Sequence, residues 1–226
     1  MSDTKKTDVI LPLTGSKSTS AAFRHAILLG GLLVLAACSD DSNQAEVANI
    51  GQCSAAKEIA AALGSKIGGD IAAFGISDTP IKMPLLSFKD REGKAVDTAS
   101  FEGKTILFNL WATWCAPCRH EMPAFDALQA EFGGDEFEII PVSVDRGGPE
   151  KPLAFYEEIG LKHLPFYQDE TMGVFNTLKK QSLAFGLPVT VLLDEEGCIL
   201  GSLNGPAEWA GEDAKTLIRT ALGKSN

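Results

Sequence analysis

The sequence predicts an α/β domain in which helices flank a central β-sheet. Two patterns support this fold class. Short apolar runs rich in β-branched and aromatic residues alternate with segments of helical period, and a hairpin and an amphipathic helix follow near the C-terminus. With 226 residues, 45% of them hydrophobic, the chain is long enough for one full domain with additional segments. Its formal net charge of -10 argues against a nucleic acid as a partner.

Residues 1–38 have the pattern of an export segment. A basic, Ser/Thr-rich lead precedes the apolar run “AILLGGLLVLAAC”, which ends at Cys38. A helix of that length rises about 20 Å, which is less than the ~30 Å hydrocarbon core of a bilayer. Three alternatives stay open: lipidation of Cys38 after cleavage, an uncleaved membrane anchor, or a plain cleaved signal. Each of them places the following domain outside the cytoplasm, and we expect residues 39–52 to be a linker.

The folded elements are expected to follow in order. Residues 53–79 form an N-terminal helical extension, with Ser54 as the N-cap and Ile59, Leu63 and Ile67 on its buried face. The domain over 80–226 then contains two short strands around a turn at 90–93, a buried strand at 105–112, a helix at 118–132, a buried strand at 137–145, a helix at 150–160, a short strand near 166–168, a helix within 171–186, a hairpin over 187–203 and a final helix over 207–222.

The stretch “WATWCAPCRHEMP” holds two cysteines, Cys115 and Cys118, with two residues between them. A structural zinc site commonly has four ligands, and His120 could add only a third ligand to this single pair of cysteines. Haem attachment needs a histidine directly after the second cysteine, where Arg119 stands. A purely structural disulfide would close a loop too small to restrain the unfolded chain much. These arguments disfavour a metal, haem or structural role.

A redox dithiol fits the position best. Cys115 ends a strand-to-helix turn, where free N–H groups and the helix dipole favour a thiolate. Pro117 suits the first helical turn because it lacks a donor that would be unpaired there. The Cys115 thiolate would attack a disulfide of a partner protein, and Cys118 would then attack Cys115 and release the reduced partner. Trp111 and Trp114 are expected to limit water near the sulfurs.

“WATWCAPC” at the end of a buried strand, with Leu187-Pro188 about 70 residues later, resembles the thioredoxin superfamily. “FNLWATWCAPCRHEMPAFDALQ”, “GLPVTVLLDEEGC” and “GPAEWAGEDA” are similar, more narrowly, to the membrane-anchored, TlpA-like thiol:disulfide interchange proteins of alphaproteobacteria. The similarity covers roughly residues 50–223. It implies a thioredoxin-like fold with a central mixed sheet, an extra N-terminal helix and a helix–strand insertion at about 149–168.

The resemblance also implies roles for individual residues. Cys115 would be the attacking cysteine and Cys118 the resolving one, and Pro188 would be a cis-proline that faces this dithiol. The exposed backbone of Leu187 would pair with an extended segment of the partner. The expected substrate groove comprises Trp114, Ala116, Pro117, Leu187 and Pro188. A second, structural disulfide is implied between Cys53 and Cys198.

One position departs from the thioredoxin pattern. Cytoplasmic thioredoxins keep a buried aspartate on the strand before the motif, and this chain has Asn109 there. Because an amide cannot accept a proton, another group must serve, and Glu121 is the nearest acid in sequence. The alternative is that Glu121 is a surface residue that stabilises the start of the helix.

The function that the resemblance implies is that of a periplasmic, membrane-tethered reductase of protein disulfides, monomeric and without cofactor or metal. It would support cytochrome maturation, notably at the copper sites of cytochrome oxidase. The expected partners are copper-delivery or oxidase-assembly proteins and an upstream transmembrane thiol reductant. Two other hypotheses use the same residues: a Cu(I)-binding chaperone with Cys115, Cys118 and His120 as ligands, and a peroxidase that acts through Cys115 alone.

Overall fold

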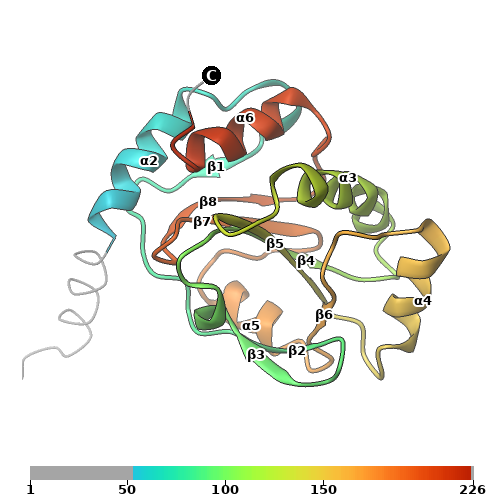
Figure 1. The fold of residues 1–226 in the computed structure, drawn as a ribbon. Coiled ribbons are helices and arrows are strands. Elements are labelled where there is room, and N and C mark those ends of the chain that lie inside the picture. The colour runs from blue at the N-terminus through green and yellow to red at the C-terminus, as the bar shows by residue number, and fades with distance from the viewer. Residues whose placement is uncertain (1–52, 225–226) are drawn as a thin grey trace, which may run out of the picture. The chain divides into compact units, whose positions relative to one another are not determined.

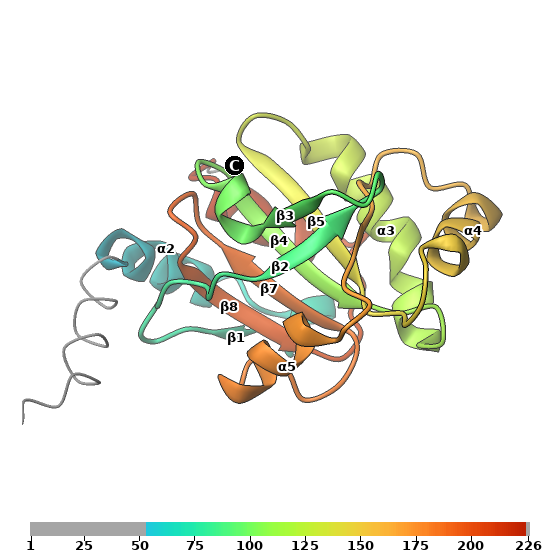
Figure 2. The same ribbon diagram turned by 90° about the horizontal axis from the view of Figure 1, so that it is seen from below.

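The computed structural model describes residues 53–224, which form an eight-stranded mixed sheet with helices on both faces. The strand order is β1-β8-β7-β4-β5-β6-β2-β3. Figures 1 and 2 place α2, α3 and α6 on one face and α5 on the opposite face. The helices are α2 (Ser54–Gly64), α3 (Ala116–Phe132), α4 (Glu150–Ile159), α5 (Gly173–Lys180) and α6 (Glu212–Ala221), and the strands are β1 (Gly75–Ile76), β2 (Ser87–Asp90), β3 (Ala95–Asp97), β4 (Thr105–Trp111), β5 (Phe137–Ser143), β6 (Tyr167–Gln168), β7 (Val189–Leu193) and β8 (Ile199–Asn204). The thioredoxin-like α/β fold is confirmed.

Strand β4 forms the centre of the sheet. All seven of its residues are buried, and it pairs in parallel with β5 and antiparallel with β7. A strand covered on both faces must be apolar throughout, which explains its nearly continuous hydrophobic run. The register sets Leu110 opposite Val189. The segment that precedes β7 therefore lies beside the turn that follows β4.

Residues 149–168 supply α4 and β6. Strand β6 pairs in parallel with β5 and antiparallel with β2, so it connects the β2–β3 hairpin to the central strands. Helix α4 packs on the end of β4, where the ring of Trp111 lies 5.5 Å from that of Phe155 and 5.7 Å from that of Tyr156. This segment thus supports the strand that leads into the two-cysteine motif.

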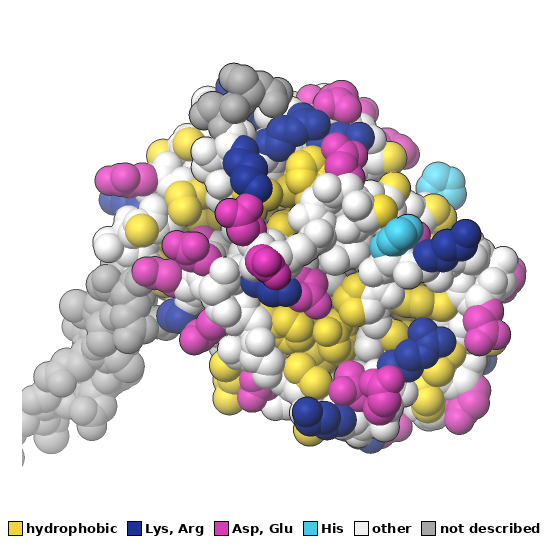
Figure 3. All heavy atoms as spheres, viewed as in Figure 1, with side chains coloured by type: hydrophobic (Ala, Val, Ile, Leu, Met, Phe, Trp, Pro, Cys, Tyr) yellow, Lys and Arg dark blue, Asp and Glu magenta, His cyan; other side chains and the backbone are white. Residues whose placement is uncertain are grey.

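Helix α3 is joined to α6 by ion pairs and to the segment before α6 by aromatic packing. Lys215 lies 2.7 Å from a Glu131 oxygen and Arg219 lies 3.7 Å from the other. The rings of Phe125 and Trp209 are 5.3 Å apart. In Figure 3, lysine and arginine side chains gather over the region of α6.

The N-terminal extension differs from the prediction in detail. Cys53, not Ser54, occupies the N-cap position of α2, so the predicted cap is wrong. Ile59 and Ile67 are only partly buried, because the face packed on α6 and β8 carries small residues, Ala56 and Ala60, together with Leu63. The extension also contributes β1, which pairs with β8.

The final helix begins at Glu212, five residues later than predicted. The indole of Trp209 is completely buried, and its Nε1–H donates to Glu121. These interactions hold the segment before α6 in an irregular conformation, and Gly211 is the N-cap residue of the helix.

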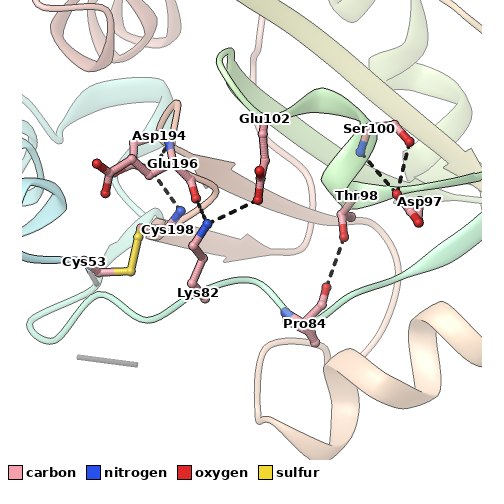
Figure 4. Close-up of polar contacts among 10 residues, drawn as sticks. All are labelled: Cys53, Lys82, Pro84, Asp97, Thr98, Ser100, Glu102, Asp194, Glu196 and Cys198. Carbon is pink, nitrogen blue, oxygen red and sulfur yellow. Dashed lines mark hydrogen bonds and ion pairs between the residues drawn. A yellow bond between two sulfur atoms is a disulfide. The ribbon is translucent and has the colours of Figure 1, made fainter. Parts of the chain in front are cut away.

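A disulfide joins Cys53 to Cys198 and so attaches the extension to the β7–β8 turn. The carboxylate of Asp194 accepts the backbone N–H groups of Glu196 and Cys198 at 3.0 and 2.8 Å. Lys82 donates to the Glu196 carbonyl and lies 3.3 Å from Glu102 (Figure 4). The turn is therefore ordered by its own hydrogen bonds as well as by the disulfide.

None of the helices within residues 53–224 is long and apolar enough to span a bilayer. The predicted export segment (1–38), the linker (39–52) and the lipidation of Cys38 lie outside the described residues.

We expect the Cys53→Ser/Cys198→Ser double variant to unfold more easily than the parent chain. The disulfide closes a loop with a sequence separation of 145 residues. Its removal should lower the free energy of unfolding by about 2–5 kcal/mol, because a long loop restricts the unfolded chain most. Urea unfolding of the two oxidised proteins measures the difference. The matched control is Cys115→Ser/Cys118→Ser, which removes a disulfide between cysteines with a sequence separation of only 3. This change should lower the free energy of unfolding by about 2 kcal/mol or less. Equal losses would contradict this account.

Candidate redox site

The two cysteines of the motif lie at the junction of β4 and α3. They are joined by a disulfide, with Cα atoms 5.3 Å apart. Cys115 is the N-cap residue of α3, and its sulfur accepts the backbone N–H of Cys118 at 3.3 Å. Cys115 is 6% exposed and Cys118 1%, so Cys115 is the more accessible sulfur-bearing residue. A helix N-terminus favours negative charge, and the same N–H would stabilise a Cys115 thiolate.

The turn that carries the dithiol is held by a buried carboxylate. Asp145, which is 2% exposed, accepts the backbone N–H of Thr113 at 2.8 Å and its hydroxyl at 2.6 Å. The Ser143 hydroxyl donates to the same carboxylate at 2.9 Å. The N–H of Val144 donates to the carbonyl of Trp111 at 2.9 Å. Sequence reasoning did not single out Asp145, although an acid directly after a buried strand was a usable signal.

The predicted groove residues differ in exposure. Trp114 is 63% exposed, so its ring is available to a partner, whereas Trp111 is completely buried against α4. Ala116 and Pro117 are exposed in the first turn of α3. The exposure of Trp114 does not fit the expectation that it keeps water from the sulfurs, and the ring contacts of Trp111 are with core residues of α4.

The segment before β7 completes this surface. The Leu187–Pro188 peptide bond is cis, and Pro188 is buried while Leu187 is half-buried. Phe185, two residues earlier, is 72% exposed. Sequence reasoning missed Phe185, because an aromatic residue at the end of a helical pattern reads as part of a core.

Glu121 is buried in the second turn of α3. It is 3% exposed, and its Oε1 accepts both the Ala207 N–H and the Trp209 Nε1–H at 2.8 Å. Its Oε2 has no hydrogen-bond partner in the described part of the chain. Desolvation by burial raises the pKa of Glu121 from 4.5 to about 7, although the two hydrogen bonds oppose this rise. The alternative of a surface glutamate is therefore wrong.

Asn109 is also buried, and its Oδ1 has no hydrogen-bond partner among the described residues, but its amide does not titrate. Asn109 is 1% exposed, and its Nδ2 donates to the Thr190 hydroxyl at 3.0 Å within the β4–β7 pair. His120 is exposed on α3. The one cluster of three potential metal ligands found among residues 53–224 is Asp194, Glu196 and Cys198, and its cysteine already belongs to a disulfide. In this disulfide form the motif cysteines and His120 do not make a three-ligand site.

Comparison with known proteins agrees with this geometry. Residues 80–218 match the Redoxin family. The chain is 33% identical over 136 residues to the thiol-disulfide oxidoreductase ResA of Halalkalibacterium halodurans. The matched region covers 58% of this chain and 72% of that protein.

Two solved structures share the fold. A thiol:disulfide interchange protein of the thioredoxin family from Chlorobium tepidum superposes with a TM-score of 0.54 at 25% identity, over 64% of this chain and 97% of that one. The thioredoxin domain of a thiol-disulfide oxidoreductase from Bacteroides vulgatus gives a TM-score of 0.51 at 25% identity, over 62% and 94%. With the dithiol at the β4–α3 junction, these matches show that the chain belongs to the Redoxin family and is a thiol-disulfide oxidoreductase of the thioredoxin superfamily.

Proposed function

We propose that this protein is a membrane-tethered periplasmic reductase of protein disulfides in which Cys115 attacks and Cys118 resolves. The observation that carries the proposal is the position of the Cys115 sulfur, which accepts an N–H in the first turn of α3. Developing negative charge on that sulfur meets a donor and a helix N-terminus. Cys118 is less exposed than Cys115, which supports its role as the resolving cysteine.

Electrons and protons balance in two steps. The Cys115 thiolate attacks the partner's disulfide, forms a mixed disulfide and expels one partner thiolate, which takes a proton from the medium. Cys118 then loses its proton and attacks Cys115, which releases the second partner thiolate. The partner is reduced by two electrons, and the enzyme ends in the disulfide form that the structure contains.

Glu121 is the proposed acceptor of the Cys118 proton. It follows Cys118 by three residues on α3, so both side chains lie on the same face of the helix. A pKa of about 7 means that both protonation states are populated near neutral pH, as proton transfer in that range requires. Asn109 cannot take this role because its amide has no site for a proton at such pH.

The exposed surface around Cys115 is the proposed docking site for the partner. Trp114, Ala116 and Pro117 lie on one side of it, and Leu187 and Pro188 precede the neighbouring strand β7. An extended segment of the partner would pair with the Leu187 backbone beside the dithiol. Phe185 adds a second large exposed apolar side chain to this surface.

The cellular role extends this proposal. The TlpA-like motifs and the export pattern of residues 1–38 support a domain (80–226) held outside the cytoplasm by its N-terminus, through an anchor or a lipidated Cys38. An upstream transmembrane thiol donor would restore the dithiol. The proposed substrates are copper-delivery or cytochrome oxidase assembly proteins, and the protein would act as a monomer without a cofactor.

The variant Cys118→Ser should attack partner disulfides and then stall, because no second sulfur can release the product. We expect a covalent complex linked through Cys115, together with insulin reduction lowered by at least about 100-fold. Cys115→Ser should form no complex, and the parent chain should turn over. Reducing and non-reducing electrophoresis with mass spectrometry identifies the linked species. Undiminished insulin reduction by Cys118→Ser would contradict the two-cysteine mechanism. Undiminished reduction of hydrogen peroxide by the same variant would favour a peroxidase that uses Cys115 alone.

Replacement Glu121→Gln should change how stability depends on pH. Between about pH 4.5 and pH 7 the folded protein holds a Glu121 proton that the unfolded chain has lost, so stability falls as the pH rises through this window. The variant has no carboxyl at this position and does not lose stability in this way. The free energy of unfolding of the variant, minus that of the parent, should therefore increase by about 3 kcal/mol as the pH rises from 4.5 to 7.

Urea unfolding at pH values from 4.5 to 8 measures this difference. The control is Glu157→Gln, which removes an exposed carboxylate on α4 and should follow the parent at every pH. A constant difference between parent and Glu121→Gln would show that burial does not raise the pKa of this carboxyl.

A further inference from the structure

A cavity of about 440 Å³ opens next to the dithiol. Pro117, which lies between the two cysteines, forms part of its wall. The polar side chains around it come from three separate segments: Asp70 from a 3₁₀ turn of the N-terminal extension, His120 and Glu121 from α3, and Glu208 from the segment before α6. A molecule held here would touch the first turn of the redox helix.

The lining of this cavity is suited to a cation. It contains three carboxyl groups and one imidazole, and no lysine or arginine belongs to it. Asp70 and Glu208 are exposed at its rim, whereas Glu121 is 3% exposed. The Oε2 atom of Glu121 is buried without a hydrogen-bond partner in the described residues, so the ionised form of this carboxyl is incompletely stabilised and a cation held in the cavity would favour it.

We propose that this cavity, lined by Asp70, Glu121 and Glu208, binds a lysine or arginine side chain of the disulfide-bearing partner protein. This inference rests on the proposed function and names a feature of its substrates. A lysine ammonium offers three donors and an arginine guanidinium five, enough to serve carboxylates from separate segments at once. An extended chain rises about 3.3 Å per residue, so the basic residue would lie within a few positions of the partner's cysteine.

Charge coupling inside the cavity gives the subsite a chemical consequence. The negative charge of Glu208 helps to raise the pKa of Glu121, after the larger effect of burial. A bound cation acts in the opposite direction and favours the ionised carboxylate. The charged or titratable groups that line the same cavity are Asp70, His120 and Glu208. Docking of a basic partner would therefore convert Glu121 into the base that the resolving step requires.

A bare metal ion fits the cavity less well. Potential ligand atoms of Asp70, His120, Glu121 and Glu208 do not form a three-residue cluster within 4.8 Å, a spacing met in residues 53–224 only around Asp194. A flexible side chain with several donors spans wider gaps than a single ion with bonds of about 2 Å.

The test uses the reduced full-length chain and three peptides that carry the same internal disulfide. The residue two positions from the attacked cysteine is lysine, glutamine or glutamate. We expect kcat/KM for the lysine peptide to exceed that for the glutamine peptide about 5- to 10-fold at low ionic strength, with glutamate lowest. The ratio should shrink as salt is added.

The variant Asp70→Asn/Glu208→Gln should lower the lysine-to-glutamine ratio to about 1–2. The matched control Glu92→Gln/Glu195→Gln removes the same net charge from two exposed turns and should keep the ratio of the parent. Glu195 follows β7, whose far end lies beside the start of β4, away from the dithiol. Because each ratio is internal to one protein, a loss of folded molecules lowers both rates and leaves the ratio unchanged.

The outcomes separate the two proposals. Failure to reduce any of the three peptides would overturn the proposed function. Reduction of all three at equal rates, or an undiminished lysine preference in Asp70→Asn/Glu208→Gln, would overturn the cation subsite and leave the reductase intact. Retention of a divalent metal by the parent, without any lysine preference, would assign the cavity to an ion instead.

Discussion

The carboxylate of Asp145 fixes the turn on which the redox chemistry depends. It receives the N–H and hydroxyl of Thr113 and the hydroxyl of Ser143, and these three donors offset the cost of burying it. Because Thr113 lies two residues before Cys115, the end of β5 determines where the first turn of α3 begins. Opening the Cys115–Cys118 bond removes none of these hydrogen bonds. The hydrogen bonds that hold this turn are therefore independent of the sulfur–sulfur bond that forms and breaks during turnover.

Glu121 also lies in α3, but its hydrogen bonds do not offset the cost of burying its charge. Both of its donors, Ala207 and Trp209, bind one oxygen, and the second oxygen has no partner among the described residues. Desolvation then outweighs the hydrogen bonds, and the pKa of Glu121 rises to about 7. The incomplete hydrogen bonding lowers stability above neutral pH, yet it gives Glu121 a pKa that suits the proton transfer proposed for it. A fully satisfied carboxylate would be more stable and chemically inert.

Sequence reasoning predicted the long elements and the dithiol, since continuous apolar strands and a helix-starting CxxC are local patterns. Local patterns do not predict contacts between residues that are far apart in the sequence. The burial of Glu121 comes from Ala207 and Trp209, 86 and 88 residues away, and the role of Asp145 from a contact across 32 residues. Strand β1 has only two residues, too few for a visible alternation. The pairing of Cys53 with Cys198 was implied by family resemblance, because residues alone left other pairings open.

Several contacts attach the N-terminal extension to the domain, among them the pairing of β1 with β8. The Cys53–Cys198 disulfide holds one end of α2, and the N–H of Asp70 donates to Asp213 of α6 at 3.1 Å. Close packing of α2 on α6 and β8 fills the distance between these attachments. Because the N-terminal extension is packed on the domain, it is part of the folded structure and not only a spacer. It brings the Asp70 carboxylate to the same cavity as Glu121, so residues before the matched family region would contribute to the proposed cation subsite. Under that proposal, selectivity for partners would change through the extension while the turn held by Asp145 stays the same.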